Sequence, residues 1–535
     1  MAELLHYLSI IWGRISYIGV MPWQALGEWA WRHTAYYLLS PEIALLIGVL
    51  FIALIEICTK RDNYQLASWI SLVSLLVNFS LTIHIMYFTS RYFSYGLGLW
   101  WGGLETIDPY ALFFKQLMDW GDIVLILALF HYKPLKQYRV EFLILLVCGT
   151  IAFDLMVGSS DLLAVYVMTE FGGICAYILA AFYKRELRSL ESGLKYFVTG
   201  ATSSTALLFA MGLLYGVSGS TNFYDIKTYV EGGGAAIPAV VFSIVLFMVA
   251  MGYKIGIAPF HLWIADVYEG APTPVTAYVS LFPKVAGMAV LLRILFLPFL
   301  ELKAVWLPIV LVMSICSMVF GNVMAMRQTS FKRLMGFSGI AHTGYMLIGV
   351  VAAAYVSGGE TDSLGFKSVI YYLLAYFFMN LGLFVVAMAI EHHGGTDHLD
   401  SYNGLVRRNP LLAVMVTFLL LALIGLPPTT GFWAKFLLFY NITQYYTIPW
   451  NLVLVVFAII TTVIGAYYYF MLAYRIWILP PAPEHAGRFQ PILFARTAIL
   501  IPTLFTVLLG IIYVAVPFEY VNGAYFLTSN ATGGI

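Results

Sequence analysis

The sequence predicts an all-α polytopic membrane protein with about fourteen transmembrane helices. Hydrophobic residues make up 61% of the 535 residues and charged residues only 10%, whereas a soluble protein carries about 25% charged residues. The apolar residues fall into runs close to the roughly 20 residues that cross a bilayer, and basic residues gather in every second connection. A net charge of +1 gives no reason to expect a nucleic acid partner, so the lipid bilayer is the expected environment.

The predicted spans follow the apolar runs along the chain. They lie roughly at 43–59, 65–89, 108–131, 140–158, 161–183, 192–217, 236–258, 275–298, 304–325, 332–355, 365–391, 411–446, 450–474 and 494–516. Helices 1–3 occupy 41–139, and helix 14 with the tail occupies 476–535. Residues 1–40 are an N-terminal extension of unknown role, because they hold four tryptophans but lack the basic start and cleavage site of a signal peptide.

The charges of the connections support this number of spans. Sixteen of the 28 lysines and arginines lie in the odd-numbered connections or their flanks, and few lie in the even-numbered ones. Positive residues mark the cytoplasmic side of a membrane protein, and a wrong number of spans would scramble the alternation. The odd connections are therefore expected to face the cytoplasm, with both termini on the outer face.

Two of the predicted spans are interrupted by proline, glycine and ionisable residues. The stretch 252–284 contains two lysines, a histidine and four prolines, and the stretch 425–436 reads GLPPTTGFWAKF. Irregular backbone at membrane depth is tolerated only where protein or a water-filled cavity surrounds it. The interruptions fall in helices 7 and 12, five spans apart. Helices 4–8 (140–298) and 9–13 (304–475) are therefore predicted to form two inverted five-helix repeats.

Four lysines fall inside apolar runs: Lys195, Lys254, Lys284 and Lys435. A lysine at the centre of a span costs about 2.5–3.5 kcal/mol on insertion scales, so four would cost on the order of 10–14 kcal/mol. That cost is comparable to the net stability of a whole domain, which argues against a purely structural role. Lys195 lies only a few residues into its run, where a long side chain can reach the interface, and is expected to be interfacial.

Glu170 lies in the middle of the fifth run, in VYVMTEFGGICAYIL. It is interpreted either as a buried carboxyl bonded to backbone or serine, or as the partner of a buried lysine. We choose Lys254 as that partner because it is the other ionisable group beside a helix interruption. A carboxylate stabilises a protonated lysine, so separating Glu170 from Lys254 would release a proton.

Two histidines extend this set. His261 follows Lys254 by seven residues, about two helical turns, with Pro259 between them. It is interpreted equally as a proton carrier and as a group that satisfies the carbonyls freed by Pro259. His342, in SGIAHTGYML, continues the line into the tenth span, whereas Lys332 is interpreted as a cytoplasmic flanking charge.

The remaining polar groups receive simpler interpretations. Asp266 and Glu269 are interpreted as a turn with helix-start chemistry, and Asp154 and Glu56 lie near span ends and are expected to be interfacial. The loop HHGGTDHLDSYNG lacks a standard metal-ligand spacing. The sequence has no P-loop, dinucleotide fingerprint or cluster-binding cysteine set, so neither a metal nor a cofactor site is expected in this chain.

Four motifs together resemble one family. They are ESGLKYFVTGATSSTALLFAMGLLYG (191–216), GYKIGIAPFHLWIADVYEGAPTPV (252–275), FGNVMAMRQTSFKRLMGFSGIAHTGYML (320–347) and GLPPTTGFWAKF (425–436). Over roughly 160–440 the chain resembles the N-type antiporter-like subunit of respiratory complex I, the NADH-quinone oxidoreductase, and its chloroplast-type relatives. The motif HLWIADVYEGAPTPV is similar to the N-type form, whereas L-type, M-type and sodium/proton antiporter subunits read closer to HTWLPDA.

The resemblance implies roles for individual residues. The proton-transferring carboxylate and lysines of spans five, seven, eight and twelve correspond to Glu170, Lys254, Lys284 and Lys435. Accessory members of the proton path correspond to Lys195, His261 and His342. Family members of this type hold no redox cofactor, and the quinone, flavin and iron–sulfur clusters are expected in other subunits.

The implied function is proton translocation across an energy-transducing inner (cytoplasmic) membrane, driven by quinone reduction elsewhere in the complex. The expected partners are the M-type and K-type neighbours in the membrane arm. The expected path enters near Lys254 and His261, passes Lys284 and reaches Lys435. A subunit of a cation/proton antiporter and a non-pumping structural subunit remain alternatives, and the sequence does not distinguish NADH from ferredoxin as the electron donor of the complex.

Overall fold

The computed structural model describes residues 37–59, 64–92, 99–130, 132–357, 360–361, 363–445, 447–481, 487 and 493–512. Its membrane-length helices are α3 (Ser40–Thr59), α4 (Tyr64–Tyr92), α5 (Pro109–Leu129), α6 (Arg139–Gly158), α7 (Leu162–Ala180), α8 (Leu187–Ser218), α10 (Pro238–Ile255), α12 (Thr273–Phe296), α13 (Lys303–Ala325), α14 (Phe331–Ala353), α15 (Ser363–His392), α19 (Pro449–Trp477) and α20 (Leu493–Ile512). Shorter helices are α9 (Phe223–Glu231), α11 (Leu262–Gly270), α16 (Leu405–Arg408), α17 (Pro410–Ile424) and α18 (Thr430–Thr443). Two small hairpins pair β1 (Leu99–Trp100) with β2 (Glu105–Thr106) and β3 (Val356–Ser357) with β4 (Glu360–Thr361).

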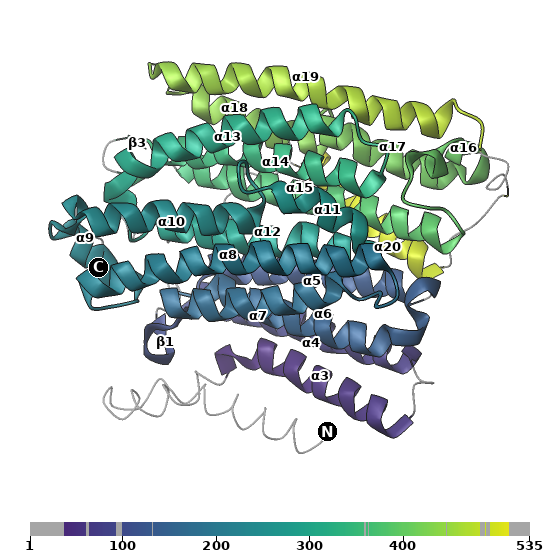
Figure 1. The fold of residues 1–535 in the computed structure, drawn as a ribbon, viewed down its shortest axis with the longest axis horizontal. Helices are drawn as coiled ribbons and strands as arrows, with labels where there is room; N and C mark the ends of the chain where they lie inside the picture. The colour runs from purple at the N-terminus through teal and green to yellow at the C-terminus, as the bar shows by residue number, and fades with distance from the viewer. Residues whose placement is uncertain are drawn as a thin grey trace.

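The predicted all-α membrane fold is confirmed. Each of the fourteen apolar runs is helical, and twelve helices in the described ranges are long and apolar enough to cross a membrane. Two runs fall outside these twelve for visible reasons. α5 has 21 residues but carries Lys115, Asp119 and Asp122, and the twelfth run is divided into α17 and α18. The helices lie side by side in one bundle (Figure 1).

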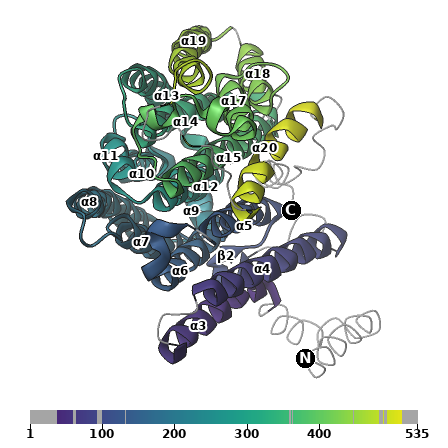
Figure 2. The same cartoon turned by 90° about the vertical axis from the view of Figure 1, so that its right-hand side faces the viewer.

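Three helices form the centre of the bundle. The spans of α12 and α14 are buried along their whole length, and that of α15 almost so. α12 packs on α5, α6, α10 and α15, whereas α14 packs on α11, α13, α15 and α18, and Figure 2 shows the three central helices enclosed by the others. The outer helices keep apolar side chains exposed, for example Val167 and Phe171 on α7. Polar groups of the central helices therefore contact protein and not lipid.

Helices 7 and 12 are broken as predicted, with different placements of their lysines. α10 ends at Gly256 (φ 74°) and α17 ends at Gly425 (φ 90°), and both glycines hold the left-handed conformation that closes a helix and disfavours other residues. Lys254 lies in the last turn before the first break, whereas Lys435 lies in α18, after the second. The lysine therefore precedes the break in the first broken helix and follows the break in the second.

The prediction that Asp266 and Glu269 belong to a turn is wrong, because both lie inside α11. The helix resumes at Leu262 directly after the break, with His261 at its N-cap. The connection to α12 is short, since α12 begins at Thr273. The two carboxylates are thereby held on a rigid helix.

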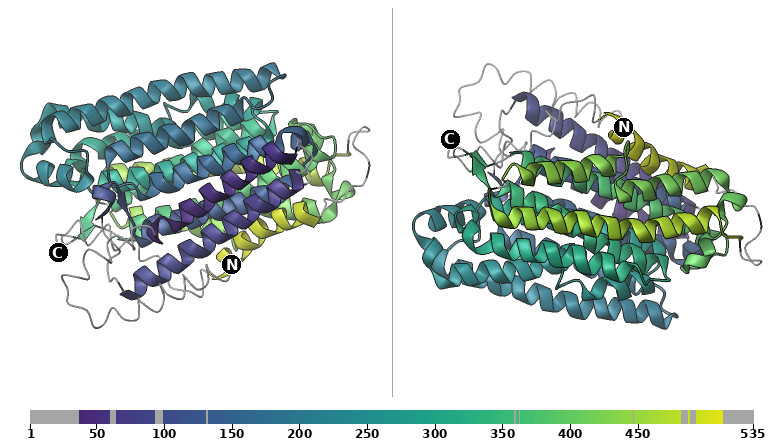
Figure 3. Two further views of the ribbon diagram at one scale, coloured as in Figure 1. Left: turned by 90° about the horizontal axis from the view of Figure 1, so that it is seen from below. Right: turned by 90° about the horizontal axis from the view of Figure 1, so that it is seen from above.

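The first two helices and the last helix pack on neighbouring parts of the bundle. α3 and α4 pack beside α5 and α6, and α20 returns along the bundle to pack on α5 and α15 (Figures 2 and 3). The predicted position of both termini and nearly all of the predicted 1–40 extension lie outside the described residues. The inverted relation between helices 4–8 and 9–13 remains a prediction.

Candidate functional site

The central helix α14 brings several predicted groups together. It carries Gly339, His342 and Tyr345 at intervals of three residues, so they lie on successive turns. Lys284 reaches α14 from α12, where its ammonium nitrogen Nζ donates to the Gly339 carbonyl at 2.9 Å. Lys435 reaches it from α18, with Nζ 5.1 Å from the centre of the Tyr345 ring. One buried helix therefore contacts both lysines.

Lys284 lies in an enclosed cradle made of a carbonyl, an aromatic ring and a glycine. Lys284 is only 3% exposed. Besides the Gly339 carbonyl, Nζ lies 4.9 Å from the centre of the Tyr376 ring, a distance at which the ring face attracts a cation. A Cβ placed on Gly339 would lie 3.1 Å from Nζ, so the absence of a side chain there makes room for the ammonium.

Lys435 has the same type of surroundings at the second helix break. Its Nζ donates to the carbonyls of Leu423 at 3.0 Å and Ile424 at 2.8 Å, which belong to the last turn of α17 and have no partner within that helix. A Cβ on Gly425 would lie 3.0 Å from Lys435 Cδ. The ammonium thus closes the open, partially negative end of α17.

Lys254 repeats the arrangement with longer distances. Its Nζ lies 3.4 Å from the Thr169 carbonyl of α7 and 6.0 Å from the centre of the Tyr177 ring. A Cβ on Gly173 would lie 3.3 Å from Nζ. The side chain also borders α12, because a Cβ on Gly287 would lie 3.5 Å from Lys254 Cβ. The three predicted lysines therefore share one environment and follow one another from α10 through α12 to α18.

Within the part of the chain that the structure describes, these three lysines lack a directly bonded counter-ion. Among the ion pairs of the described residues, none involves Lys254, Lys284 or Lys435. Burial away from water disfavours the charged form of a lysine, whereas a bound carboxylate would hold the proton in place. The arrangement therefore suits groups that take up and release protons.

His342 lies between the second and third lysines. Its Nδ1 lies 2.8 Å from the Tyr372 hydroxyl and its Nε2 3.1 Å from the Tyr469 hydroxyl. The Tyr469 hydroxyl also bonds to Ser338 at 2.5 Å. Both ring nitrogens thus have polar partners inside the bundle, which suits a histidine that passes a proton.

Glu170 does not form the predicted ion pair with Lys254. Its Oε1 accepts a hydrogen bond from the Ser204 hydroxyl, while Lys254 bonds to the carbonyl of the preceding residue, Thr169. Glu170 is only partly buried, next to the exposed face of α7. The two side chains are close enough for electrostatic interaction without a direct bond.

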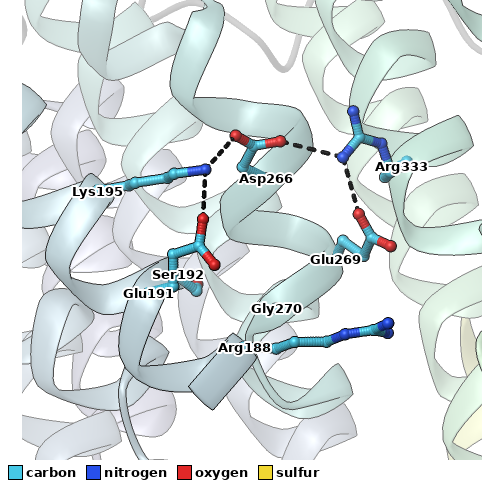
Figure 4. Close-up of a pocket in the computed structure, with 8 residues that line it drawn as sticks. All are labelled: Arg188, Glu191, Ser192, Lys195, Asp266, Glu269, Gly270 and Arg333. Carbon is cyan, nitrogen blue, oxygen red and sulfur yellow. Dashed lines mark hydrogen bonds and ion pairs between the residues drawn. The ribbon is translucent and has the colours of Figure 1, made fainter.

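Lys195 and His261 do not belong to the group of three buried lysines. Lys195 is interfacial as predicted, with its side chain 43% exposed, and it pairs with Glu191 and Asp266 at 2.7 Å each. The opposite oxygen of Asp266 pairs with Arg333, so this surface network ties α8, α11 and α14 together (Figure 4). His261 holds the N-cap position of α11 without a side-chain cap bond, and its Nδ1 is buried without a hydrogen-bond partner within the described ranges.

The other polar loop groups have structural partners. The buried Lys332 donates to the Ala271 carbonyl at 2.9 Å. Asp397 accepts from the Lys332 backbone N–H at 2.9 Å and so caps α14, although burial raises the pKa of this loop carboxyl. A hydrogen bond from Arg475 lowers the pKa of Asp400. Within the described residues, no three histidine, cysteine or acidic side chains are placed to hold a metal ion.

Sequence reasoning missed a second set of buried ionisable groups on the N-terminal side. Lys115 pairs with Glu42 at 2.6 Å and with Glu105 at 2.8 Å. Arg293 pairs with Asp108 through two bonds of 2.9 and 3.1 Å. Further buried acids are Asp119, Asp122 and Asp154. The sequence contains a signal for this set, because three of its charged residues interrupt the third apolar run. The interpretation of Asp154 as interfacial is wrong, because α6 places it against α5 and leaves it 1% exposed.

The cradle of Lys284 leads to a first prediction, for Gly339→Ala. The new Cβ would lie 2.8 Å from the Tyr376 hydroxyl oxygen and 3.1 Å from Lys284 Nζ, which forces the ammonium away from its carbonyl. Misplacing a reacting group by 1 Å costs about 10²-fold, so we expect proton-coupled turnover to fall by about tenfold. The measurement is turnover in membranes with matched subunit content. Gly212→Ala on α8 is the control, because its Cβ meets no atom within 4 Å, and equal loss in both variants would contradict the prediction.

Comparison with known proteins identifies similar chains. The family described as NADH:quinone oxidoreductase/Mrp antiporter, TM, matches residues 159–465. NADH-quinone oxidoreductase subunit N 1 of Rhizobium meliloti (strain 1021) is 36% identical over 406 residues, which cover 75% of this chain and 80% of the relative. NADH-quinone oxidoreductase subunit N of Chlorobium chlorochromatii (strain CaD3) is 33% identical over 487 residues, which cover 88% and 91%.

Solved structures share the fold. A chain of respiratory complex I from Thermus thermophilus with bound aureothin aligns with a TM-score of 0.72 at 26% identity and covers 89% of this chain and 98% of its own length. A chain of the membrane-bound sulfane sulfur reductase, an archaeal respiratory membrane complex, aligns with a TM-score of 0.78 at 20% identity and covers 93% and 98%. At that identity the second likeness concerns the fold alone.

Proposed function

The chain belongs to the NADH:quinone oxidoreductase/Mrp antiporter transmembrane family, and from that premise we propose that it is a proton-translocating membrane subunit of a complex-I-type quinone oxidoreductase. The observation that carries the proposal is the lysine row, Lys254, Lys284 and Lys435, whose buried ammonium groups contact carbonyls and rings and no carboxylate of the described residues. The relatives that it resembles are N subunits of NADH-quinone oxidoreductases. The electron donor of this complex, NADH or ferredoxin, is left open.

The proposed path follows the three buried lysines of the lysine row, Lys254, Lys284 and Lys435. A proton enters from the cytoplasmic side near Lys254 and His261, passes to Lys284, and reaches Lys435 by way of His342. At each step one ammonium becomes an amine as the next amine becomes an ammonium, so the row carries charge without displacing a heavy atom over a long distance. Glu170 modulates the Lys254 end through its field, and Lys195 serves near the surface of α8.

The proposal also covers the membrane and the neighbouring subunits of this chain. It is an integral membrane subunit of a respiratory membrane complex, and we propose M-type and K-type subunits as its neighbours in an energy-transducing inner (cytoplasmic) membrane. Both termini would then lie on the outer face. Quinone, flavin and iron–sulfur clusters would reside in other subunits, so this chain would take part in the translocase without carrying electrons.

The proposal is tested with Lys254→Met in the assembled complex. Methionine is similar in length but cannot carry a proton, so we expect proton translocation and coupled quinone reduction to fall by about 10²-fold, the usual contribution of a proton-transfer group. The measurement is the pH change in membrane vesicles on addition of the electron donor, together with native electrophoresis for assembly. The control is Lys227→Met on α9, whose ammonium pairs with Glu231 at 3.7 Å. Full proton translocation by a stably assembled Lys254→Met complex would contradict the proposal.

The same vesicles distinguish the alternatives. A cation/proton antiporter would exchange sodium for protons without any electron donor, whereas the proposed subunit requires quinone reduction. A structural subunit would lose assembly in the Lys254→Met variant and would not lose translocation in the complexes that remain. Each outcome is separable because assembly, electron transfer and proton movement are measured in parallel.

A further inference from the structure

Three aspartates lie fully buried between α5 and α6, outside the lysine row. We call Asp119, Asp122 and Asp154 the carboxyl row. Each is at most 1% exposed. The cations of this region are already paired, since Lys115 binds Glu42 and Glu105 and Arg293 binds Asp108. The carboxyl row therefore has no cation of its own among the described residues.

Around the carboxyl row, the described residues supply fewer hydrogen-bond donors than buried acceptor oxygens. Asp119 Oδ1 accepts from Asn78 Nδ2 at 2.6 Å, and Asp122 Oδ2 accepts from the Thr150 hydroxyl at 2.5 Å. Six other buried oxygens in this region have no donor within the described residues. They are Glu42 Oε2, Asn78 Oδ1, Asp119 Oδ2, Asp122 Oδ1, and Oδ1 and Oδ2 of Asp154.

The amide oxygen of Asn78 makes the deficit independent of the carboxyls themselves. Asn78 is 0% exposed, its Nδ2 donates to Asp119, and its Oδ1 has no donor among the described residues. An amide oxygen can only accept a hydrogen bond, and leaving it buried without a donor costs about 1–3 kcal/mol. Among the described residues the region thus has fewer donors than acceptors, and a proton on each aspartate would add three donors.

Burial also disfavours the alternative in which the aspartates are charged. An isolated ionised carboxylate in an apolar interior is far more costly than a neutral carboxyl. Asp154 lies within electrostatic range of both Asp119 and Asp122, so three negative charges would also repel one another. Geometry, hydrogen bonding and charge all favour proton-bearing carboxyls.

The carboxyl row connects two parts of the molecule. Lys115, Asp119 and Asp122 follow one another at i, i+4 and i+7, on one face of α5, over a rise of about 10 Å. At one end, Lys115 binds Glu105 of the β1–β2 hairpin. At the other end, the Thr150 hydroxyl that binds Asp122 lies 3.4 Å from the Tyr278 hydroxyl. Tyr278 belongs to α12, the helix of Lys284.

We propose that the carboxyl row is a proton-holding branch that joins α12 at Tyr278 to the Lys115–Glu105 pair at the β1–β2 end of the bundle. A proton that leaves one carboxyl leaves a carboxylate, which is neutralised by the next proton, so the row returns to its starting charge. The transport role of the branch rests on the proposed proton translocation, whereas the holding of protons does not.

The first test measures protonation in the intact complex by infrared spectroscopy of Asp154→Asn against the wild type. Loss of a C=O stretching band of a protonated carboxyl is expected, and loss of carboxylate bands instead would overturn the proposal. Glu301→Gln is the matched control, because Glu301 is exposed and should lose carboxylate bands. Asp119→Asn provides a second variant on the other helix and is expected to give the same result as Asp154→Asn.

The second test asks whether the branch carries protons. Asp119→Asn and Asp154→Asn should lower the protons moved per quinone reduced by about tenfold, a smaller effect than the 10²-fold typical of an essential transfer group, with assembly and Glu301→Gln unchanged. Wild-type translocation in both variants overturns the branch even if the carboxyls are protonated. Wild-type translocation in Lys254→Met instead overturns the proposed function and leaves the infrared result standing, so the two failures are distinguishable.

Discussion

Replacing Lys435 by arginine is expected to stop proton translocation while leaving the complex assembled. The guanidinium keeps the positive charge and several N–H donors, so it can still bind the Leu423 and Ile424 carbonyls that Lys435 contacts at 3.0 and 2.8 Å. Arginine is not deprotonated in proteins, so it cannot pass a proton onward. We expect translocation to fall by about 10²-fold, measured as the pH change of vesicles under electron donor supply.

A parallel Lys435→Met variant separates charge from proton transfer. Methionine removes the donors and leaves the end of α17 without its cap, so lower assembly is expected for this variant than for Lys435→Arg. Arg475→Met is a control at a surface pair, where Arg475 binds Asp400 at 2.5 Å. If Lys435→Arg translocated protons at the wild-type rate, Lys435 would be a structural cap and the path through α18 would be wrong.

Removing Asp108 is expected to produce the largest loss of stability. Asp108 is 0% exposed and binds Arg293 through two hydrogen bonds. It also caps α5 by accepting from the Ala111 N–H at 2.7 Å. Breaking a buried ion pair from one side costs about 3–5 kcal/mol because the other charge stays buried, and loss of a cap adds about 1 kcal/mol. We expect Asp108→Ala to lower the temperature at which the subunit aggregates in detergent and to reduce its incorporation into membranes.

The double variant Asp108→Asn with Arg293→Met tests the stated cause. Asparagine can still cap α5, and methionine leaves no buried charge, so the double variant should be more stable than Asp108→Ala. Replacing a whole buried pair by neutral groups is often close to neutral. A double variant that is as unstable as Asp108→Ala would show that the loss of stability comes from packing and not from the unpaired charge of Arg293.

The sequence predicts the fold well because the bilayer imposes a simple length rule. Each apolar run became a helix, and the glycines at 256 and 425 end their helices as the interruptions indicated. Lys254, Lys284 and Lys435 are buried as their cost in lipid predicted. Hydropathy and insertion cost are properties of local sequence, so they can be evaluated without knowing which helices touch.

Partner identity could not be predicted because it depends on helix packing. Of the two interpretations of Glu170, the bond to serine is observed and the pair with Lys254 is not, because α7 and α8 lie side by side and bring Ser204 to the carboxyl. Asp154 was placed at the interface because it lies near a span end, whereas packing of α6 against α5 buries it. Asp266 was assigned to a turn, although it bridges two cations across three helices. In each case the missing information was a contact between distant parts of the chain.

The central position of α14 links the behaviour of two distant lysines. The Gly339 carbonyl that holds Lys284 and the Tyr345 ring that faces Lys435 lie on one helix that is buried on every side. A rotation of that helix by a single residue turns both groups through about 100°, and dense packing leaves no room for the helix to twist in part. A displacement of α14 would therefore change the surroundings of Lys284 and Lys435 together.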